Sequence, residues 1–494
     1  MISRRLAMMA VLAALVFLAG AANAAELTIA EDGETDCSIV IPAEPRAPQQ
    51  TAAEELQTYL ARATGAKLPV GTPDEVPADA PQVIVGPSER MHEVAPEIDV
   101  GSLEPDGIVM RTVDGALVLA GEPPRGTLYA VYTFLQRQVG VRWWTPEATR
   151  VPERSTLTVG ELDVEYAPPF IQRSAFYRHV SENPIFAARM KLNGHHQRIP
   201  PEYGGHRRFR GFVHTFHNLL PPSEYFEEHP EWYSLINGER TTDAQLCLSN
   251  DEMRRELTRR ALGWLRDSPD ADIISISQND RDGACRCEEC TALREKYGGT
   301  PAGDLIWFVN RVAADIEEEF PDMLVETLAY RYTRTPPEGI HPRDNVLVRL
   351  CSIECSFSQP LGSGPQNEAF RRDIEGWSDI APQLFVWNYV TNFRNYILPH
   401  PNMRVLAPNI RFFRDNSVIG LFEQGDRHCS VGDFVRMRAW VLSRLMWNPE
   451  RDAEVLRREF IRGYYGEAAA PHLLDYLRLI HDAVEESGVY LRCY

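Results

Sequence analysis

Between residues 26 and 160 the hydrophobic positions follow two different spacings. Residues 52–62 and 126–135 carry apolar side chains at helical spacing, whereas 83–85 and 117–120 are short apolar runs bounded by glycine and proline. This mixture predicts a small α/β domain over residues 26–160. Trp143 and Trp144, near its end, could stack on sugar rings, but packing against the next domain is the interpretation we favour.

After a proline-rich break at residues 166–169 the pattern changes to alternating strands and helices. Strands are expected at 171–176, 211–214, 245–248, 273–277, 324–329, 346–353, 384–389 and 418–423, and helices at 254–267, 304–320 and 367–378. Eight strands at this spacing predict a (β/α)8 barrel of the TIM type, to which we assign residues 167–430. Helical runs at 436–445 and 453–465 predict a C-terminal helical region over 431–494.

The first 24 residues have the pattern of a secretory signal peptide. Arg4 and Arg5 are followed by an apolar stretch at 6–18 and by the small residues of 22–24. The apolar stretch is too short for a stable membrane anchor, and no later segment is hydrophobic enough to span a membrane. We therefore expect an exported bacterial protein, periplasmic or secreted, that begins near Ala25.

Net charge and cysteine content indicate which macromolecules and metal ions the protein can bind. The net charge of −19 argues against binding to nucleic acid or to an anionic membrane surface. Among nine cysteines, Cys285, Cys287 and Cys290 form one cluster, which could bind zinc with Cys247 or a histidine as the fourth ligand. Because the chain is expected to be exported, we favour the interpretation that these three cysteines form a disulfide or remain free thiols. No other cofactor is expected.

Carboxylates and amides stand where several of the expected strands end. Asn279 and Asp280 follow strand 273–277, Glu354 follows 346–353, and Glu423 ends 418–423. In barrel enzymes these strand ends form the active site. Glycoside hydrolysis needs a protonated acid and a group that stabilises the oxocarbenium-like centre, which Asp280, Glu423 and Glu354 could supply. The alternative is that each carboxylate caps a helix or pairs with an arginine.

Other polar and aromatic side chains at the same strand ends could hold a sugar. They are His214, Tyr330, Arg331, Trp387, Asn388 and Tyr389, together with Asn279. Aromatic faces suit the apolar C–H faces of sugar rings, and amides suit the hydroxyls. Trp387 alone would fit a core position equally well. We expect a carbohydrate or a glycoprotein glycan as the substrate.

Several motifs resemble a known bacterial family. The chain is similar to the domain of unknown function 4838 at six motifs. They are Ser277-Gln-Asn-Asp280 with the cysteine cluster, the motifs at 304–310, 328–330 and 385–389, Gly420-Leu-Phe-Glu-Gln-Gly425 and the motif at 445–449. Part of that family is classified as glycoside hydrolase family 163, endo-β-N-acetylglucosaminidases acting on N-glycans. Residues 124–132 and 140–146 resemble the accessory domain that precedes the barrel in α-glucuronidases and β-hexosaminidases. The resemblance covers most of residues 45–470.

The resemblance implies a retaining enzyme in which the 2-acetamido group of the substrate acts as nucleophile. Related acetamido-assisted enzymes have adjacent polar residues at the end of strand four, where this chain has Asn279 and Asp280. Several such families have a glutamate there as the acid, so Glu354 or Glu423 could be the acid here. Two other functions stay open. One is an α-glucuronidase-like hydrolase in which Arg331 or Arg178 binds a uronate, and the other is a non-catalytic carbohydrate-binding barrel.

Overall fold

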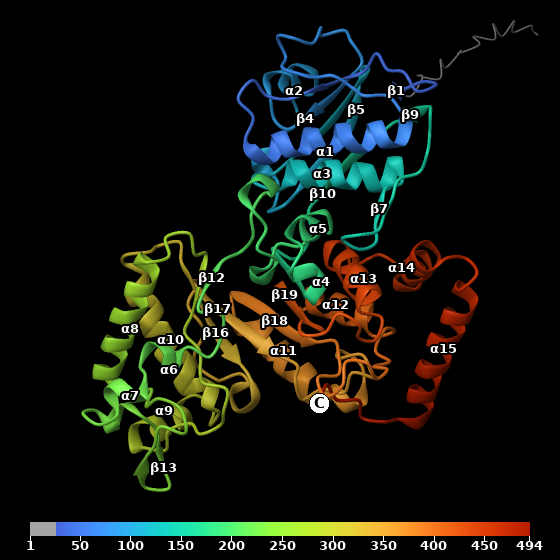
Figure 1. Cartoon of the computed structure of the whole chain (residues 1–494). Coiled ribbons are helices and arrows are strands. Elements are labelled where there is room, and N and C mark those ends of the chain that lie inside the picture. The colour runs from blue at the N-terminus through green and yellow to red at the C-terminus, as the bar shows by residue number, and fades with distance from the viewer. Residues whose placement is uncertain (1–25) are drawn as a thin grey trace, which may run out of the picture.

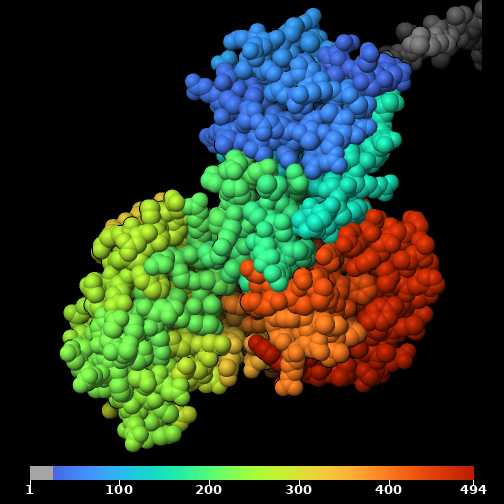
Figure 2. All heavy atoms as spheres, viewed as in Figure 1, coloured from blue at the N-terminus to red at the C-terminus, as the bar shows by residue number. Residues whose placement is uncertain are grey.

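A computed structural model describes residues 26–494, so the predicted signal peptide lies outside the described residues. Figure 1 shows a smaller N-terminal lobe, a curled parallel sheet flanked by helices, and a group of C-terminal helices beside that sheet. In the space-filling view the N-terminal lobe, in blue, stands on the larger lobe, and the green part of the chain lies between them (Figure 2). No helix in the described part of the chain is long and apolar enough to cross a membrane.

The N-terminal lobe is built on a six-stranded sheet with the strand order β10-β5-β6-β4-β2-β3. The bounds are Ser38–Val40 (β2), Val70–Gly71 (β3), Gln82–Val85 (β4), Ile108–Val113 (β5), Ala116–Gly121 (β6) and Asp163–Tyr166 (β10). Helices α1 (Ala47–Thr64) and α3 (Gly126–Phe134) pack side by side (Figure 1). Gly65 ends α1 with a φ of 83°, which favours glycine. The predicted small α/β domain is confirmed.

The paired tryptophans after α3 are structural. Trp143 is fully buried, and its indole N–H donates to the Tyr59 hydroxyl at 2.7 Å. The Trp144 ring lies 5.2 Å from that of Trp440 and 5.5 Å from that of Phe460, centre to centre. Both partners of Trp144 belong to the C-terminal helices, so the packing interpretation is confirmed.

Within residues 26–494 the larger lobe has one sheet of seven parallel strands, in the order β11-β19-β18-β17-β16-β15-β12. The bounds are Gln172–Phe176 (β11), Phe209–Arg210 (β12), Ile273–Ser275 (β15), Leu324–Ala329 (β16), Val346–Cys351 (β17), Gln383–Tyr389 (β18) and Val418–Gln424 (β19). The sheet curls as in a TIM-type barrel, but no ladder joins its end strands β11 and β12 in the described chain. It is therefore a half-barrel.

The strand predicted at residues 245–248, the third of the eight, is not present in the sheet. Residues 245–248 lie outside the sheet, and Leu246 forms only an isolated bridge with Tyr233. The Gln245 amide explains the difference, because its oxygen accepts from the Asn279 backbone N–H at 2.9 Å and its nitrogen donates to the Arg281 carbonyl at 2.6 Å. The segment therefore supports the loop after β15. As a result, β15 is the third strand of the sheet in chain order, not the fourth.

The second predicted strand, at 211–214, is also misplaced. The strand of this region is β12, two residues long, and it ends before Gly211. Gly211 has a φ of 67° and His214 a φ of 55°, so the backbone of 211–214 is not extended throughout. The carboxyl end of the second strand therefore comes earlier in the chain than the hydrophobic pattern indicates.

Helices cover the sheet and extend beyond it. They are α8 (Asp251–Arg266), α10 (Pro301–Glu317), α11 (Glu368–Ile380), α12 (Leu406–Asp415), α13 (Val435–Trp447), α14 (Ala453–Phe460) and α15 (Ala470–Ser487). The three helices predicted between strands are confirmed within a few residues, as are the C-terminal helices. Helix α13 packs against β11, while α15 lies at the outer edge of the molecule (Figure 1).

A buried ion cluster joins the two lobes at Asp106. Its carboxylate accepts from Arg125 at 2.6 Å, from Arg173 at 2.7 Å and from the Asn193 amide at 3.0 Å. Arg173 lies in β11, so the contact ties the first barrel strand to the N-terminal lobe. Burial alone would raise the pKa of Asp106, but the two guanidinium groups outweigh it and lower the pKa.

Candidate active site

All the strands of the half-barrel run parallel, so their carboxyl ends meet at one edge. Following the sheet from β15 to β19, this edge carries Asp280, Tyr330, Glu354, Trp387 and Glu423 in turn. The adjoining ladders are parallel throughout. The prediction that Asp280 and Glu423 lie at the same end of the barrel is therefore confirmed. This is the end at which barrel enzymes carry out their chemistry.

A pocket of about 630 Å³ opens at this edge. It is lined by Asp280, Tyr330, Arg331, Ile353, Glu354, Arg394, Arg492 and Tyr494. Arg492 and Tyr494 belong to the C-terminal segment, which crosses the mouth. Two backbone hydrogen bonds hold this segment, from the Phe357 N–H to the Leu491 carbonyl (2.8 Å) and from the Phe393 N–H to the Cys493 carbonyl (2.7 Å). The volume lies in the range of small-molecule sites.

Asp280 is the exposed carboxylate of this pocket, with 63% of its side chain accessible. The Tyr330 hydroxyl donates to its Oδ1 at 3.1 Å, and His214 Nε2 stands 3.9 Å from the same oxygen. His214 Nδ1 lies 2.7 Å from the Gln278 carbonyl, which can only accept, so Nδ1 carries the proton. In the neutral ring Nε2 is then an acceptor, and it attracts Asp280 only when His214 is protonated.

Glu354 faces the same pocket and is held by an arginine. Arg334 donates to its carboxylate at 2.8 Å and to Asp373 at 2.6 Å, while 53% of the Glu354 side chain remains exposed. Arg331 lies on the wall of the pocket and pairs with Asp282 at 2.8 Å. Glu354 therefore stands at the pocket with Arg334 as its partner, where its carboxylate can interact with a bound substrate.

Glu423 is buried in a row of hydrogen bonds that crosses three strand ends. Ser352 donates to Asn388 at 2.7 Å, and the Asn388 amide donates to Glu423 Oε2 at 2.9 Å. Glu423 Oε1 has no hydrogen-bond partner within residues 26–494. Burial raises the pKa of Glu423 to about 7, so about half of these carboxyl groups still carry a proton at pH 7.

The structure does not bring all the predicted site residues together. Asn279 is occupied in its loop, since its oxygen accepts from the His217 N–H at 3.1 Å and its amide donates to the Ala244 carbonyl at 3.1 Å. The Trp387 indole is half-buried and donates to Gln424 Oε1 at 2.7 Å. Of the residues expected in one pocket, Asp280 and Glu354 line it, whereas Asn279, Trp387 and Glu423 do not.

The reason lies in the position of each residue relative to its strand. Asp280 and Glu354 come after the last paired residue of β15 and β17 and are free to turn into the mouth. Asn388, Tyr389 and Glu423 still belong to β18 and β19, and all three are buried. Asn388 donates a hydrogen bond to Glu423, and none of the three side chains lines the pocket.

Several site residues were missed by sequence reasoning. Arg394, Arg492 and Tyr494 line the pocket from segments that have no periodic pattern. Asp426, two residues beyond β19, is buried, and burial raises its pKa to about 6. The Tyr177 hydroxyl, just after β11, is buried and unpaired within the described chain. For Asp426 a signal existed, since it follows a predicted strand end as closely as Asp280 does.

Comparison with known proteins places the chain in a family. Residues 143–478, well over half of the chain, match the family described as Domain of unknown function (DUF4838). The chain belongs to the DUF4838 family. Residues 29–134 of this DUF4838 protein match a second family, which is described as Glycosyl hydrolase family 67 N-terminus. No curated protein matches the sequence.

Three solved structures match the chain at low sequence identity. A family GH115 4-O-methyl-α-glucuronidase with specificity for decorated arabinogalactans is 12% identical, with a TM-score of 0.57 over 92% of this chain and 62% of its own. The DUF4838 protein thus spans less than two thirds of that enzyme. A β-N-acetylhexosaminidase from Bacteroides fragilis (12%, TM-score 0.49, 89% and 92%) and CpGH84D (9%, TM-score 0.47, 88% and 69%) also match.

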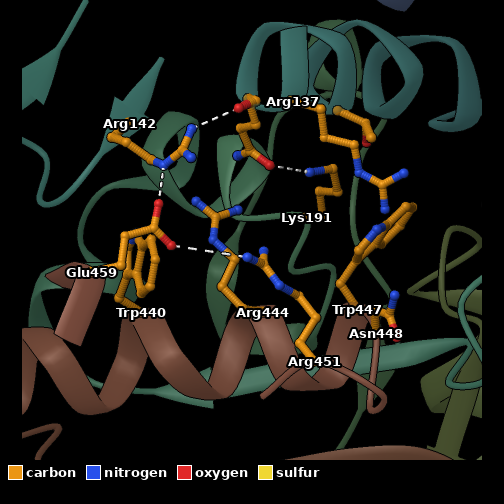
Figure 3. Close-up of a pocket in the computed structure, with 11 residues that line it drawn as sticks. Arg137, Arg142, Lys191, Trp440, Arg444, Trp447, Asn448, Arg451 and Glu459 are labelled. Carbon is orange, nitrogen blue, oxygen red and sulfur yellow. Dashed lines mark hydrogen bonds and ion pairs between the residues drawn. The ribbon is translucent and has the colours of Figure 1, made fainter. Parts of the chain in front are cut away.

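A second pocket of the DUF4838 protein, of about 290 Å³, is rich in cations (Figure 3). Lys191 donates to Gln136 at 2.8 Å, and Arg142 pairs with Glu459 at 2.5 Å. Arg444 and Trp447, both in α13, form another wall. Its lining has a single carboxylate and lies away from the strand ends that carry Asp280 and Glu354. It would attract anions, but it lacks the paired carboxyl groups of a hydrolase site.

Four of the nine cysteines of the DUF4838 protein form a separate cluster beside the loop after β15. Cys285, Cys287 and Cys290 converge with Cys247, and all four are buried. Their side chains face one another and not the pocket that contains Asp280. They are the described residues best suited to bind a metal ion.

Proposed function

We propose that this DUF4838 protein is an exported glycoside hydrolase that cleaves GlcNAc-containing glycans. The proposal rests on one observation above all, the pocket at the carboxyl edge of the parallel sheet in which Asp280 and Glu354 face a space of about 630 Å³. Tyr330 orients Asp280, and both Tyr330 and Tyr494 offer aromatic surface to a sugar ring. Family membership and the barrel-type fold support the same reaction class.

The proposed mechanism uses the 2-acetamido group of the substrate as the nucleophile. Its carbonyl oxygen attacks the anomeric carbon while a proton passes to the departing glycosidic oxygen, and water then opens the cyclic intermediate with retention. Asp280 would accept a hydrogen bond from the acetamido N–H and stabilise the positive charge that develops there. Glu354, held by Arg334, would add to this stabilisation.

Glu423 is the carboxyl group best suited to supply the proton. Burial raises its pKa to about 7, so it can hold a proton close to neutral pH. Because its side chain has no exposed surface, the mechanism requires that substrate binding opens a path to it. The Ser352–Asn388 row holds Glu423 in place until then.

Asp280→Asn is expected to lower kcat on the true substrate by about two orders of magnitude, because the neutral amide cannot stabilise the positive charge of the intermediate. Steady-state kinetics on the purified variant would measure this. Asp243→Asn is the matched control, since Asp243 is an exposed aspartate that pairs with Arg281 of the same loop outside the pocket. Equal activity of the two variants would remove Asp280 from the mechanism.

An α-glucuronidase-like activity is the second candidate. Arg331, Arg394 and Arg492 all line the pocket, and guanidinium groups bind carboxylates in a bidentate manner. A substrate with a uronate carboxylate would suit this lining better than neutral GlcNAc does. The glycosyl hydrolase family 67 match of the N-terminal lobe favours the same substrate class.

One screen distinguishes these functions. The purified protein is incubated with N-glycoproteins, with aryl β-N-acetylglucosaminides and with oligosaccharides that carry α-linked glucuronate, and released sugars are identified by mass spectrometry. We expect the protein to release sugars that end in GlcNAc from the N-glycoproteins and from the aryl β-N-acetylglucosaminides. Release of glucuronate alone would support the second candidate. Binding of any of these glycans without release would indicate a non-catalytic carbohydrate-binding barrel.

A further inference from the structure

We infer that a set of four buried cysteines binds one structural zinc ion. The set, here called the four-cysteine cluster, consists of Cys247, Cys285, Cys287 and Cys290. Their sulfur atoms all lie within 4.8 Å of one another, although Cys247 is far from the other three in sequence. The fold therefore brings a fourth thiol to a motif that shows only three.

The spacing of the sulfur atoms fits a tetrahedral metal centre. Cys247 Sγ lies 3.6 Å from Cys287 Sγ and 3.9 Å from Cys290 Sγ. Four thiolates at about 2.3 Å from a zinc ion stand about 3.8 Å apart along each edge of the tetrahedron. The sulfur atoms thus converge on one centre instead of forming pairs at bonding distance. Four cysteines and no open position are typical of a structural zinc site.

The surroundings of the four-cysteine cluster are suited to thiolate charge. The Leu235 backbone N–H donates to Cys285 Sγ at 3.3 Å, and the Arg240 guanidinium lies 3.8 Å from the same sulfur. The Cys290 N–H donates to Cys287 Sγ at 3.5 Å. Cys287 is the N-cap of α9 (Glu288–Lys296), and the amino end of a helix stabilises a negative charge. Such donors around metal-bound sulfur orient the ligands.

A zinc ion here would join two segments, the one that contains Cys247 and the one that contains Cys285, Cys287 and Cys290. Figure 1 shows α9 beside the hairpin that contains β13 (Leu235–Ile236), and Cys247 comes from the segment that was predicted as a strand. The loop between β15 and α9 carries Asp280. We therefore expect the ion to hold this loop and with it the position of Asp280. The importance of Asp280 rests on the proposed function, whereas the metal site itself does not.

Metal analysis of the full chain, purified without chelator, tests the inference. We expect about one zinc ion per chain in the wild type and less than about a tenth of that in Cys290→Ser and Cys247→Ser. Cys429→Ser is the matched control, because Cys429 is a partly exposed cysteine outside the cluster, and it should keep the full zinc content. An unchanged zinc content in both cluster variants would overturn the assignment.

A second measurement covers variants that fail to fold. Wild-type protein reloaded with Co²⁺ after chelation should show the intense sulfur-to-cobalt absorption and the visible bands of a tetrahedral tetrathiolate. Alkylation of the denatured, unreduced protein followed by mass spectrometry should show the four cluster cysteines as free thiols. A metal-free wild type with a disulfide between any two of them overturns the inference, as does a single iron ion in place of zinc.

Discussion

Replacing Glu423 with glutamine is expected to lower kcat by about two to four orders of magnitude while the protein stays folded. Glutamine has nearly the shape of the protonated carboxyl group and can still accept the hydrogen bond from Asn388. It cannot release a proton to the departing glycosidic oxygen. Circular dichroism and thermal unfolding would confirm the fold, and kinetics on the substrate found in the screen would measure the loss.

The pH dependence provides an independent readout. Because Glu423 must be protonated to act as the acid, wild-type kcat should fall as the pH rises through about 7. The folded-state pKa is raised above the ordinary value of 4.5, so the contribution of this group to stability is fully present below pH 4.5, falls as the pH rises towards 7, and is lost above 7. Glu423→Gln should therefore unfold at no lower temperature than the wild type at alkaline pH.

Glu450→Gln is the control, since Glu450 is an exposed glutamate that pairs with Arg414 far from the mouth. It should leave kcat and its pH profile unchanged. If Glu423→Gln behaves in the same way, Glu423 is a buried structural acid. Glu354 then becomes the proton donor to test, because it is the glutamate that lines the pocket.

The fold was largely predictable because most of its elements carry a regular hydrophobic pattern. Strands β16 to β19 are apolar runs buried on both faces, and α8 and α10 have a clear apolar stripe. The prediction was wrong at residues 245–248, whose leucines are buried in a cluster with side chains of α8 and α10 and do not belong to a strand of the sheet. Periodicity reports that a residue is buried, but not which partner covers it.

The candidate site was predictable only where residues directly follow a strand. Asp280, Tyr330, Arg331 and Glu354 line the pocket as expected. The sequence could not indicate that Glu423 is covered, because its burial depends on side chains from neighbouring strands. Nor could it indicate the tail residues Arg492 and Tyr494, which reach the mouth from the far end of the chain.

Asp106→Ala is expected to lower the free energy of unfolding by about 3–5 kcal/mol, the cost of leaving buried charges without their partner. Asp106 is fully buried between Arg125 and Arg173, and both guanidinium groups would lose their counter-ion at once. Urea unfolding would measure the change. Asp163→Ala is the control, because Asp163 pairs with Arg111 at the surface of the same lobe and should cost less than about 1 kcal/mol.

The same carboxylate predicts how stability depends on pH. Because the folded-state pKa of Asp106 lies below its unfolded value of about 3.9, its contribution is fully present above that value and is lost as the pH falls through the folded-state pKa. The difference in unfolding free energy between wild type and Asp106→Ala should therefore be constant near neutral pH and shrink in strong acid. A difference that stays constant into strong acid would contradict the ion cluster as its cause, and would leave lost packing at the junction of the two lobes as the explanation.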